Sequence, residues 1–144
     1  MKIAIGCDHA AYDVKDKIKE FLIKENLQVV DLGTDNSDSV DYPIYGHAVA
    51  RKVSSKEVDM GIVICGSGIG ISIAANKIKG IRAALCTSEL HAELSRKHND
   101  SNILALGARL TKYKEIEKIV KVWLKTSFEG GRHLKRIKMI EIDE

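Results

Sequence analysis

The strongest constraint on the fold is a repeated alternation of short β-branched segments with amphipathic segments along the chain. Runs rich in valine, isoleucine and leucine indicate strands over residues 2–5, 28–32, 60–64, 82–86 and 102–106. In the first amphipathic segment, Val14, Ile18 and Leu22 recur at four-residue spacing opposite a charged face, which is typical of a surface helix. Further helices are expected over residues 44–53, 69–78, 88–97, 113–125 and 132–140. Strand followed by helix, five times over, predicts an α/β fold with a parallel sheet covered on both faces.

The length of 144 residues suits one packed domain and is short for two, so we expect a single domain over residues 1–144. No apolar run approaches the roughly 20 residues of a membrane span, and residues 1–5 read as a strand in place of a secretory signal. We therefore expect a cytoplasmic protein without a membrane role. A formal charge of +3 on 23 basic and 20 acidic residues gives no argument for nucleic-acid binding.

The three cysteines, Cys7, Cys65 and Cys86, are widely spaced along the chain. They form no CxxC pair and have no histidines at zinc-finger spacing. The sequence therefore predicts reduced thiols, with neither a disulfide framework nor a structural metal.

The segment Cys65-Gly66-Ser67-Gly68-Ile69-Gly70, directly after the third predicted strand, is the strongest local signal. In an open parallel sheet, ligands bind outside the carboxyl ends of the strands. Glycines at alternate positions let backbone N–H groups converge, and a helix beginning near Ile69 adds the positive end of its dipole, which suits an anion. A thiol such as Cys65 beside a helix N-terminus can supply a usable thiolate. The alternative is that Cys65 is a small buried strand residue and the glycines form a tight turn.

The glycine loop does not match two common nucleotide-binding motifs. Ile71 stands where the third glycine of GxGxxG belongs, and no Lys-Ser/Thr pair follows the loop as in a Walker motif. Dinucleotide binding is therefore disfavoured.

Three further candidates also follow predicted strands. Asp8 and His9 come after the first strand, where each could act as an acid, a base or a phosphate ligand. Arg109 follows the last strand and is a candidate anion ligand by position. The alternative for the first pair is that Asp8 caps a helix and His9 faces solvent.

Four candidates lie near helix ends or on a helix face. His98 and Asn99 close the fourth predicted helix, where a histidine is free to shuttle protons, although capping by the asparagine is the simpler reading. Arg132 and Arg136 are four residues apart, which places both on one face of a helix and suits a phosphate. The alternative for the arginines is a solvated charged face.

Together these segments resemble the B-type ribose-5-phosphate isomerases, in the family that also contains galactose-6-phosphate and allose-6-phosphate isomerases. The resemblance is nearly end to end and is carried by motifs in a fixed order. These are Gly6-Cys7-Asp8-His9-Ala10, Asp41-Tyr42-Pro43, the run from Cys65 to Lys77, the run from Leu94 to Asp100, Gly107-Ala108-Arg109 and Glu129-Gly130-Gly131-Arg132-His133.

The resemblance implies a three-layer α/β/α sandwich with a five-stranded parallel, Rossmann-like sheet. It also implies a homodimer or dimer of dimers with a shared active site, and isomerisation of a small sugar phosphate without a metal or other cofactor. Cys65 resembles the base that carries a proton between C1 and C2, and Ile71 occupies the position where another branch places a glutamate. The amides of Gly66 to Gly70 would hold the developing enediolate.

The remaining roles follow from the same resemblance. His98 with Asp8 resembles the pair that opens the furanose ring, and the hydroxyl of Ser67, where a threonine is frequent, can assist it. Residues that resemble substrate-hydroxyl contacts are Tyr42 and Asn99. Residues that resemble the phosphate clamp are His9, Arg109, Arg132 and Arg136.

Interconversion of ribose-5-phosphate and ribulose-5-phosphate is the first hypothesis. Allose-6-phosphate or galactose-6-phosphate remains an alternative substrate, because pocket length depends on side chains that the sequence does not place. A non-catalytic module that senses a phosphorylated ligand is a second alternative, and it would leave Cys65, Asp8 and His98 without a role.

Overall fold

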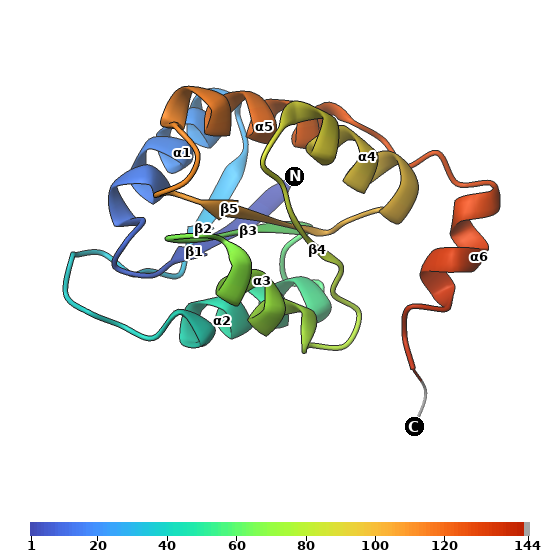
Figure 1. The fold of residues 1–144 in the computed structure, drawn as a ribbon, viewed down its shortest axis with the longest axis horizontal. Coiled ribbons are helices and arrows are strands. Elements are labelled where there is room, and N and C mark those ends of the chain that lie inside the picture. The colour runs from blue at the N-terminus through green and yellow to red at the C-terminus, as the bar shows by residue number, and fades with distance from the viewer. Residues whose placement is uncertain (143–144) are drawn as a thin grey trace.

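The computed structural model describes residues 1–142 and contains one five-stranded parallel sheet (Figure 1). The strand order is β2-β1-β3-β5-β4, so the first half of the chain builds one side of the sheet and the second half builds the other. The strands are β1 (Lys2–Cys7), β2 (Gln28–Asp31), β3 (Met60–Cys65), β4 (Ala83–Leu85) and β5 (Ile103–Gly107). The parallel α/β sandwich predicted from the sequence is confirmed. The expected domain extends to residue 144, and residues 143 and 144 lie outside the described part.

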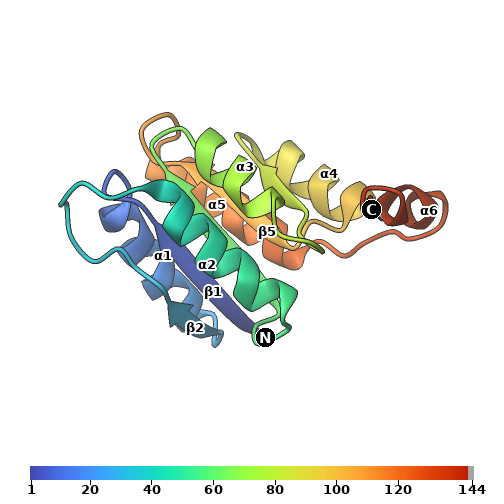
Figure 2. The ribbon, with the colours of Figure 1, turned by 90° about the horizontal axis from the view of Figure 1, so that it is seen from below.

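Helices cover both faces of the sheet. The helices α1 (Tyr12–Lys24), α4 (Glu89–Asn99) and α5 (Tyr113–Lys125) pack on one face, and α2 (Tyr42–Ser54) and α3 (Ile69–Asn76) pack on the other (Figure 1). The short helix α6 (Arg132–Lys138) packs beside α4 and projects from one end of the molecule (Figure 2). Within residues 1–142, every helix is too short or too polar to cross a bilayer.

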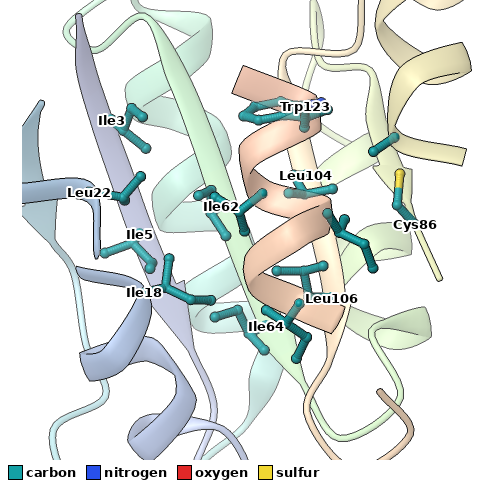
Figure 3. Packing of buried hydrophobic residues seen from close by; sticks show 14 of the residues in the cluster. Ile3, Ile5, Ile18, Leu22, Ile62, Ile64, Cys86, Leu104, Leu106 and Trp123 are labelled. Carbon is teal, nitrogen blue, oxygen red and sulfur yellow. The ribbon is translucent and has the colours of Figure 1, made fainter. Parts of the chain in front are cut away.

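Alternation along the strands divides the core into two layers. Ile62 and Ile64 of β3 point to the α1 and α5 side, where they pack with the fully buried Trp123 (Figure 3). Val63 and Cys65, of opposite parity, point to the α2 and α3 side. Cys65 therefore belongs to the layer that α2 and α3 cover.

The element boundaries differ from the sequence prediction where side chains replace or end regular backbone pairing. The edge strand β4 begins at Ala83, because the Arg82 N–H donates to the Asn102 side chain at 2.8 Å in place of a strand partner. Helix α4 continues two residues beyond the predicted end and stops where Asp100 adopts a left-handed conformation, with φ 45°. This extension makes His98 and Asn99 the last two helical residues.

Lys15 of α1 fixes the segment that follows β2. Its side chain is fully buried, and its ammonium group donates to the Asp31 carboxylate at 2.9 Å, the Thr34 carbonyl at 2.8 Å and the Asp35 carboxylate at 3.1 Å. Burial alone would lower the pKa of Lys15, but the hydrogen bonds to Asp31 and Asp35 raise it above its usual value. Burial would likewise raise the pKa of Asp31, but hydrogen bonds from Lys15, the Gly33 amide and Lys19 lower it.

Replacing Lys15 by methionine should lower the free energy of unfolding by about 3 kcal/mol at pH 7, because it leaves the partly buried Asp31 carboxylate short of its main cation. The lowered pKa of Asp31 makes the contribution of this pair complete above about pH 4 and lost as the pH falls through the folded-state pKa. The difference between wild type and variant should therefore shrink in acid. Urea unfolding at several pH values measures it, with Lys24→Met on the exposed end of α1 as the matched control. Equal losses in both variants would contradict the role given to Lys15.

Candidate active site

Three neighbouring strands of the sheet end at the same edge and bring the first group of candidates together. Cys7 of β1 pairs with Ile64 of β3, and Cys65 pairs with Gly107 of β5. Backbone pairing between these segments continues past the strand ends. The Asp8 amide donates to the Ile64 carbonyl at 3.2 Å, and the Arg109 amide donates to the Gly66 carbonyl at 3.0 Å. Asp8, Cys65 and Arg109 therefore lie at the ends of adjacent strands.

The loop after β3 folds back over the Cys65 thiol. The Gly68 N–H donates to Cys65 Sγ at 3.1 Å, and the Ile69 N–H donates to Ser67 Oγ at 3.1 Å. Gly68 has φ +79°, and a Cβ there would lie 2.8 Å from the Leu106 carbonyl carbon, so only glycine fits this turn. An N–H group aimed at sulfur stabilises negative charge on that sulfur.

The hydrogen bonds of this loop narrow the set of amides that remain for an oxyanion. Gly68 is committed to the thiol and Ile69 to Ser67, whereas Gly70 lies in the first turn of α3, where amides have no acceptor within the helix. Of the amides expected to act between Gly66 and Gly70, Gly70 is thus placed to donate outward at the positive end of α3.

Cys65 combines features of both readings of the sequence. It is a buried strand residue, with 5% of its surface exposed, as the simpler alternative predicts. It is nevertheless the last residue of β3 and lies under the glycine loop, whose Gly68 N–H covers its sulfur. Cys7 and Cys86 are more deeply enclosed, and burial raises the pKa of Cys7 to about 12 and that of Cys86 to about 11.

Two side chains border the loop on the outside. A Cβ added to Gly66 would lie 3.4 Å from Arg109 Cδ, and one added to Gly70 would lie 2.6 Å from the Tyr42 ring. The close approach of the Tyr42 ring therefore needs glycine at position 70, whereas the contact at Gly66 is an ordinary van der Waals distance. Arg109 and Tyr42 are exposed, so their polar groups are available to a ligand above the loop.

The pair after β1 does not act as a simple helix cap. Ala11, not Asp8, occupies the N-cap position of α1, while one Asp8 carboxylate oxygen accepts the Ala10 N–H at 3.0 Å. His9 Nδ1 accepts the Val40 N–H at 3.1 Å, which leaves the proton of a neutral ring on Nε2. His9 thus keeps one donor for an anion.

The second group of candidates lies at the opposite edge of the sheet. Helix α4 starts at Glu89 after the carboxyl end of β4 and runs back, so that it ends at Asn99 near the amino end of β5. The ladder from Ile103 to Gly107 spans four residue steps, or roughly 13 Å. The end of α4, with His98 and Asn99, therefore lies about a sheet length from Cys65 in the same chain.

The arginines of α6 belong to this second group. Arg132 and Arg136 lie one turn apart on the projecting helix, and both are exposed. A cavity of about 550 Å³ opens near the same edge, with Asn99 and Arg82 among its lining residues. Cys65 does not line this cavity. The simpler reading of Asn99 as a left-handed cap is wrong, because Asp100 takes that position.

Two polar residues that lie beside His98 were not among the site residues predicted from the sequence. His133 of α6 stacks on the His98 ring with 4.4 Å between ring centroids, and Glu129 Oε2 lies 3.5 Å from His133 Nε2. The four-residue spacing of Glu129 and His133 was a visible signal, but the contact with His98 depends on how α6 packs against α4. One possible ligand atom from each of His98, Glu129 and His133 lies within 4.8 Å of the other two.

The fold and the first group define a class: an α/β protein of the Rossmann-like kind with an anion-binding glycine loop and a thiol at the carboxyl edge of its sheet. The chain matches the Ribose/Galactose Isomerase family over residues 3–140. It belongs to this family, and the resemblance drawn from the sequence motifs is confirmed.

Individual relatives agree along nearly the whole chain. Ribose-5-phosphate isomerase B of Escherichia coli is 48% identical over 96% of this chain and 93% of its own. The structure of Clostridium thermocellum ribose-5-phosphate isomerase B is 54% identical, with a TM-score of 0.96, and covers 97% of this chain and 95% of its own. That of Mycoplasma genitalium ribose-5-phosphate isomerase B with bound ribulose-5-phosphate is 44% identical, with a TM-score of 0.93, and covers 96% of this chain and 93% of its own.

The surroundings of the three thiols predict selective alkylation. Iodoacetamide at pH 7.5 should modify Cys65 first in the native protein, because the raised pKa values of Cys7 and Cys86 leave them almost entirely protonated. Peptide mass spectrometry with time measures each site, and unfolding in guanidinium should make all three react. Modification of Cys86 at the rate of Cys65 in the native protein would overturn this assignment.

Proposed function

We propose that this isomerase interconverts ribose-5-phosphate and ribulose-5-phosphate, with Cys65 as the base that carries the proton. The observation that carries the proposal is the thiol at the end of β3, held under a glycine loop whose Gly68 N–H points at its sulfur. The end-to-end similarity to ribose-5-phosphate isomerases B, one of them with ribulose-5-phosphate bound, supports this choice of substrate.

In the aldose-to-ketose direction, the Cys65 thiolate removes the proton from C2 of the open-chain sugar. The electron pair of that C–H bond forms the C1–C2 double bond, and the carbonyl electrons move to O1, which gives an enediolate. A proton then passes from O2 to O1, and the Cys65 thiol returns its proton to C1. The Gly70 amide and the positive end of α3 stabilise the negative oxygen during these steps.

Ring opening precedes this transfer, because ribose-5-phosphate is mostly a closed furanose. His98 protonates the ring oxygen while Asp8 accepts the proton of the anomeric hydroxyl, and Ser67 assists with its hydroxyl. The ring oxygen and the anomeric carbon are bonded neighbours. A His98 that lies roughly 13 Å away along the sheet cannot serve the same sugar as Cys65 of its own chain.

A homodimer, alone or paired into a tetramer, resolves this separation by pairing the Cys65 edge of one copy with the His98 edge of another. Exposed apolar side chains flank the short edge strand β4, with Ile69 and Ile73 on α3 and Leu90 and Leu94 on α4. Such a patch beside a sheet edge favours contact with a second copy. The projecting α6 supports the same arrangement.

The phosphate clamp is divided in the same way. His9 and Arg109 come from the chain that supplies Cys65, whereas Arg132 and Arg136 come from the second copy together with His98 and Asn99. Tyr42 borders the glycine loop and contacts sugar hydroxyls. Binding energy from the distant phosphate positions the carbon that reacts.

We place the protein in the cytoplasm, as one isomerase domain without a cofactor. The three cysteines are free thiols in the structure, which agrees with a reducing compartment. A six-carbon substrate is an alternative within the same chemistry, and we favour the five-carbon sugar because of the names of the relatives reported above. Rates with ribose-5-phosphate, allose-6-phosphate and galactose-6-phosphate, measured with a chelator present, separate these substrates.

Replacing Cys65 by alanine should lower kcat for ribose-5-phosphate by roughly 10²- to 10⁴-fold, the usual contribution of a positioned general base. Substrate binding, measured by calorimetry, should persist because the phosphate ligands remain. Cys86→Ala, which removes a buried thiol from the opposite core layer, serves as the control and should keep near-normal kcat. Full activity of the Cys65 variant would remove the thiol from the mechanism, and a wild type that binds the sugar phosphate without turnover would favour a non-catalytic module.

A further inference from the structure

Three side chains with metal-binding atoms meet where α4 ends and α6 begins. One ligand atom from each of His98, Glu129 and His133 lies within 4.8 Å of the other two. Two histidines and a carboxylate form a donor set that zinc accepts, with a fourth position open to water.

The backbone already holds the three residues near one another. The Glu129 N–H donates to the Lys97 carbonyl at 3.1 Å, next to His98 on α4. His133 follows Glu129 by four residues, in the first turn of α6, and only 7% of its surface is exposed. Half of the Glu129 side chain is exposed, so that a cation can approach from solvent and the carboxylate can turn toward it.

We propose that this cluster binds Zn²⁺, or a cation of similar chemistry, and that the bound metal inhibits the enzyme by occupying His98. The inference rests on the proposed function, in which a free His98 nitrogen opens the sugar ring. A zinc ion needs ligand atoms at about 2.0–2.2 Å. The two rings are stacked, with 16° between their planes. The lone pairs of their nitrogens therefore lie in nearly parallel planes and do not point at one common ion. Binding must therefore turn the rings out of the stack, and this movement takes His98 from its catalytic position.

Positive charge on the neighbouring helices weakens metal binding, so we expect reversible inhibition and not a permanently bound metal. Lys97, Arg132 and Arg136 lie on the same two helices and repel a cation. Histidine ligands favour Zn²⁺, Cu²⁺ and Co²⁺ over Mg²⁺ and Ca²⁺, which prefer oxygen. Inhibition should therefore be selective for zinc-like metals and reversed by a chelator.

Metal binding is tested without reference to catalysis. Equilibrium dialysis of the full-length protein should find one Zn²⁺ per chain, and Co²⁺ should give visible absorption bands from a nitrogen and oxygen site. His133→Gln and Glu129→Gln should each weaken binding by more than about tenfold, because each removes one of only three protein ligands. His91→Gln, at the other end of α4, is the matched control and should bind as wild type does.

A second set of measurements distinguishes this metal site from one at the Cys65 thiol. Cys65→Ala should bind Co²⁺ as wild type does, whereas a lost near-ultraviolet sulfur band would assign the metal to Cys65. Zinc should inhibit wild type and His91→Gln but not His133→Gln at the same concentration. Metal binding equal in wild type and His133→Gln, or binding without inhibition, would overturn the proposal. If wild type binds zinc yet never isomerises the sugar phosphate, the proposed function fails while the metal site stands.

Discussion

A parallel sheet obliges each connecting helix to run back from the carboxyl edge to the amino edge, and this constraint organises the whole candidate site. It gathers Asp8, the Cys65 loop and Arg109 at one edge, since β1, β3 and β5 are neighbours and end in register. The same rule sends the end of α4, with His98, to the other edge. In the proposed mechanism one chain therefore holds two halves of a site, and a second copy brings complementary halves together.

The glycine loop links the fold to the chemistry at the first edge. Its turn requires glycine at position 68 because of a positive φ and the nearby carbonyl group of Leu106. Gly70 admits the Tyr42 ring at close range, and Arg109 lies beside Gly66. The loop thus places a donor on the Cys65 sulfur, leaves a helix N-terminus open and collects a cation and a phenol around the same small space. Each of these features suits the proposed carbanion chemistry next to a phosphate.

Local patterns in the sequence were sufficient for the strands, the helices and the loop after β3, because hydrophobic period and glycine spacing are properties of short segments. They also placed Asp8 and Arg109 at strand ends. They could not reveal that Lys15 is fully buried among acceptors, since its neighbours are 16 and 20 residues away. The contact between His98 and His133 was invisible for the same reason, as it depends on the position of α6 against α4.

The division of the site between two copies is the central claim, and mixed dimers test it most directly. Cys65→Ala and His98→Asn chains, each nearly inactive alone, are unfolded together in equal amounts and refolded. In a mixed dimer with shared sites, one site receives both mutations and the other receives none. Random pairing should then restore about a quarter of the wild-type activity per chain. Recovery of that activity on mixing agrees with sites built from two chains, whereas a mixture as inactive as its components would show that Cys65 and His98 of the same chain serve one sugar.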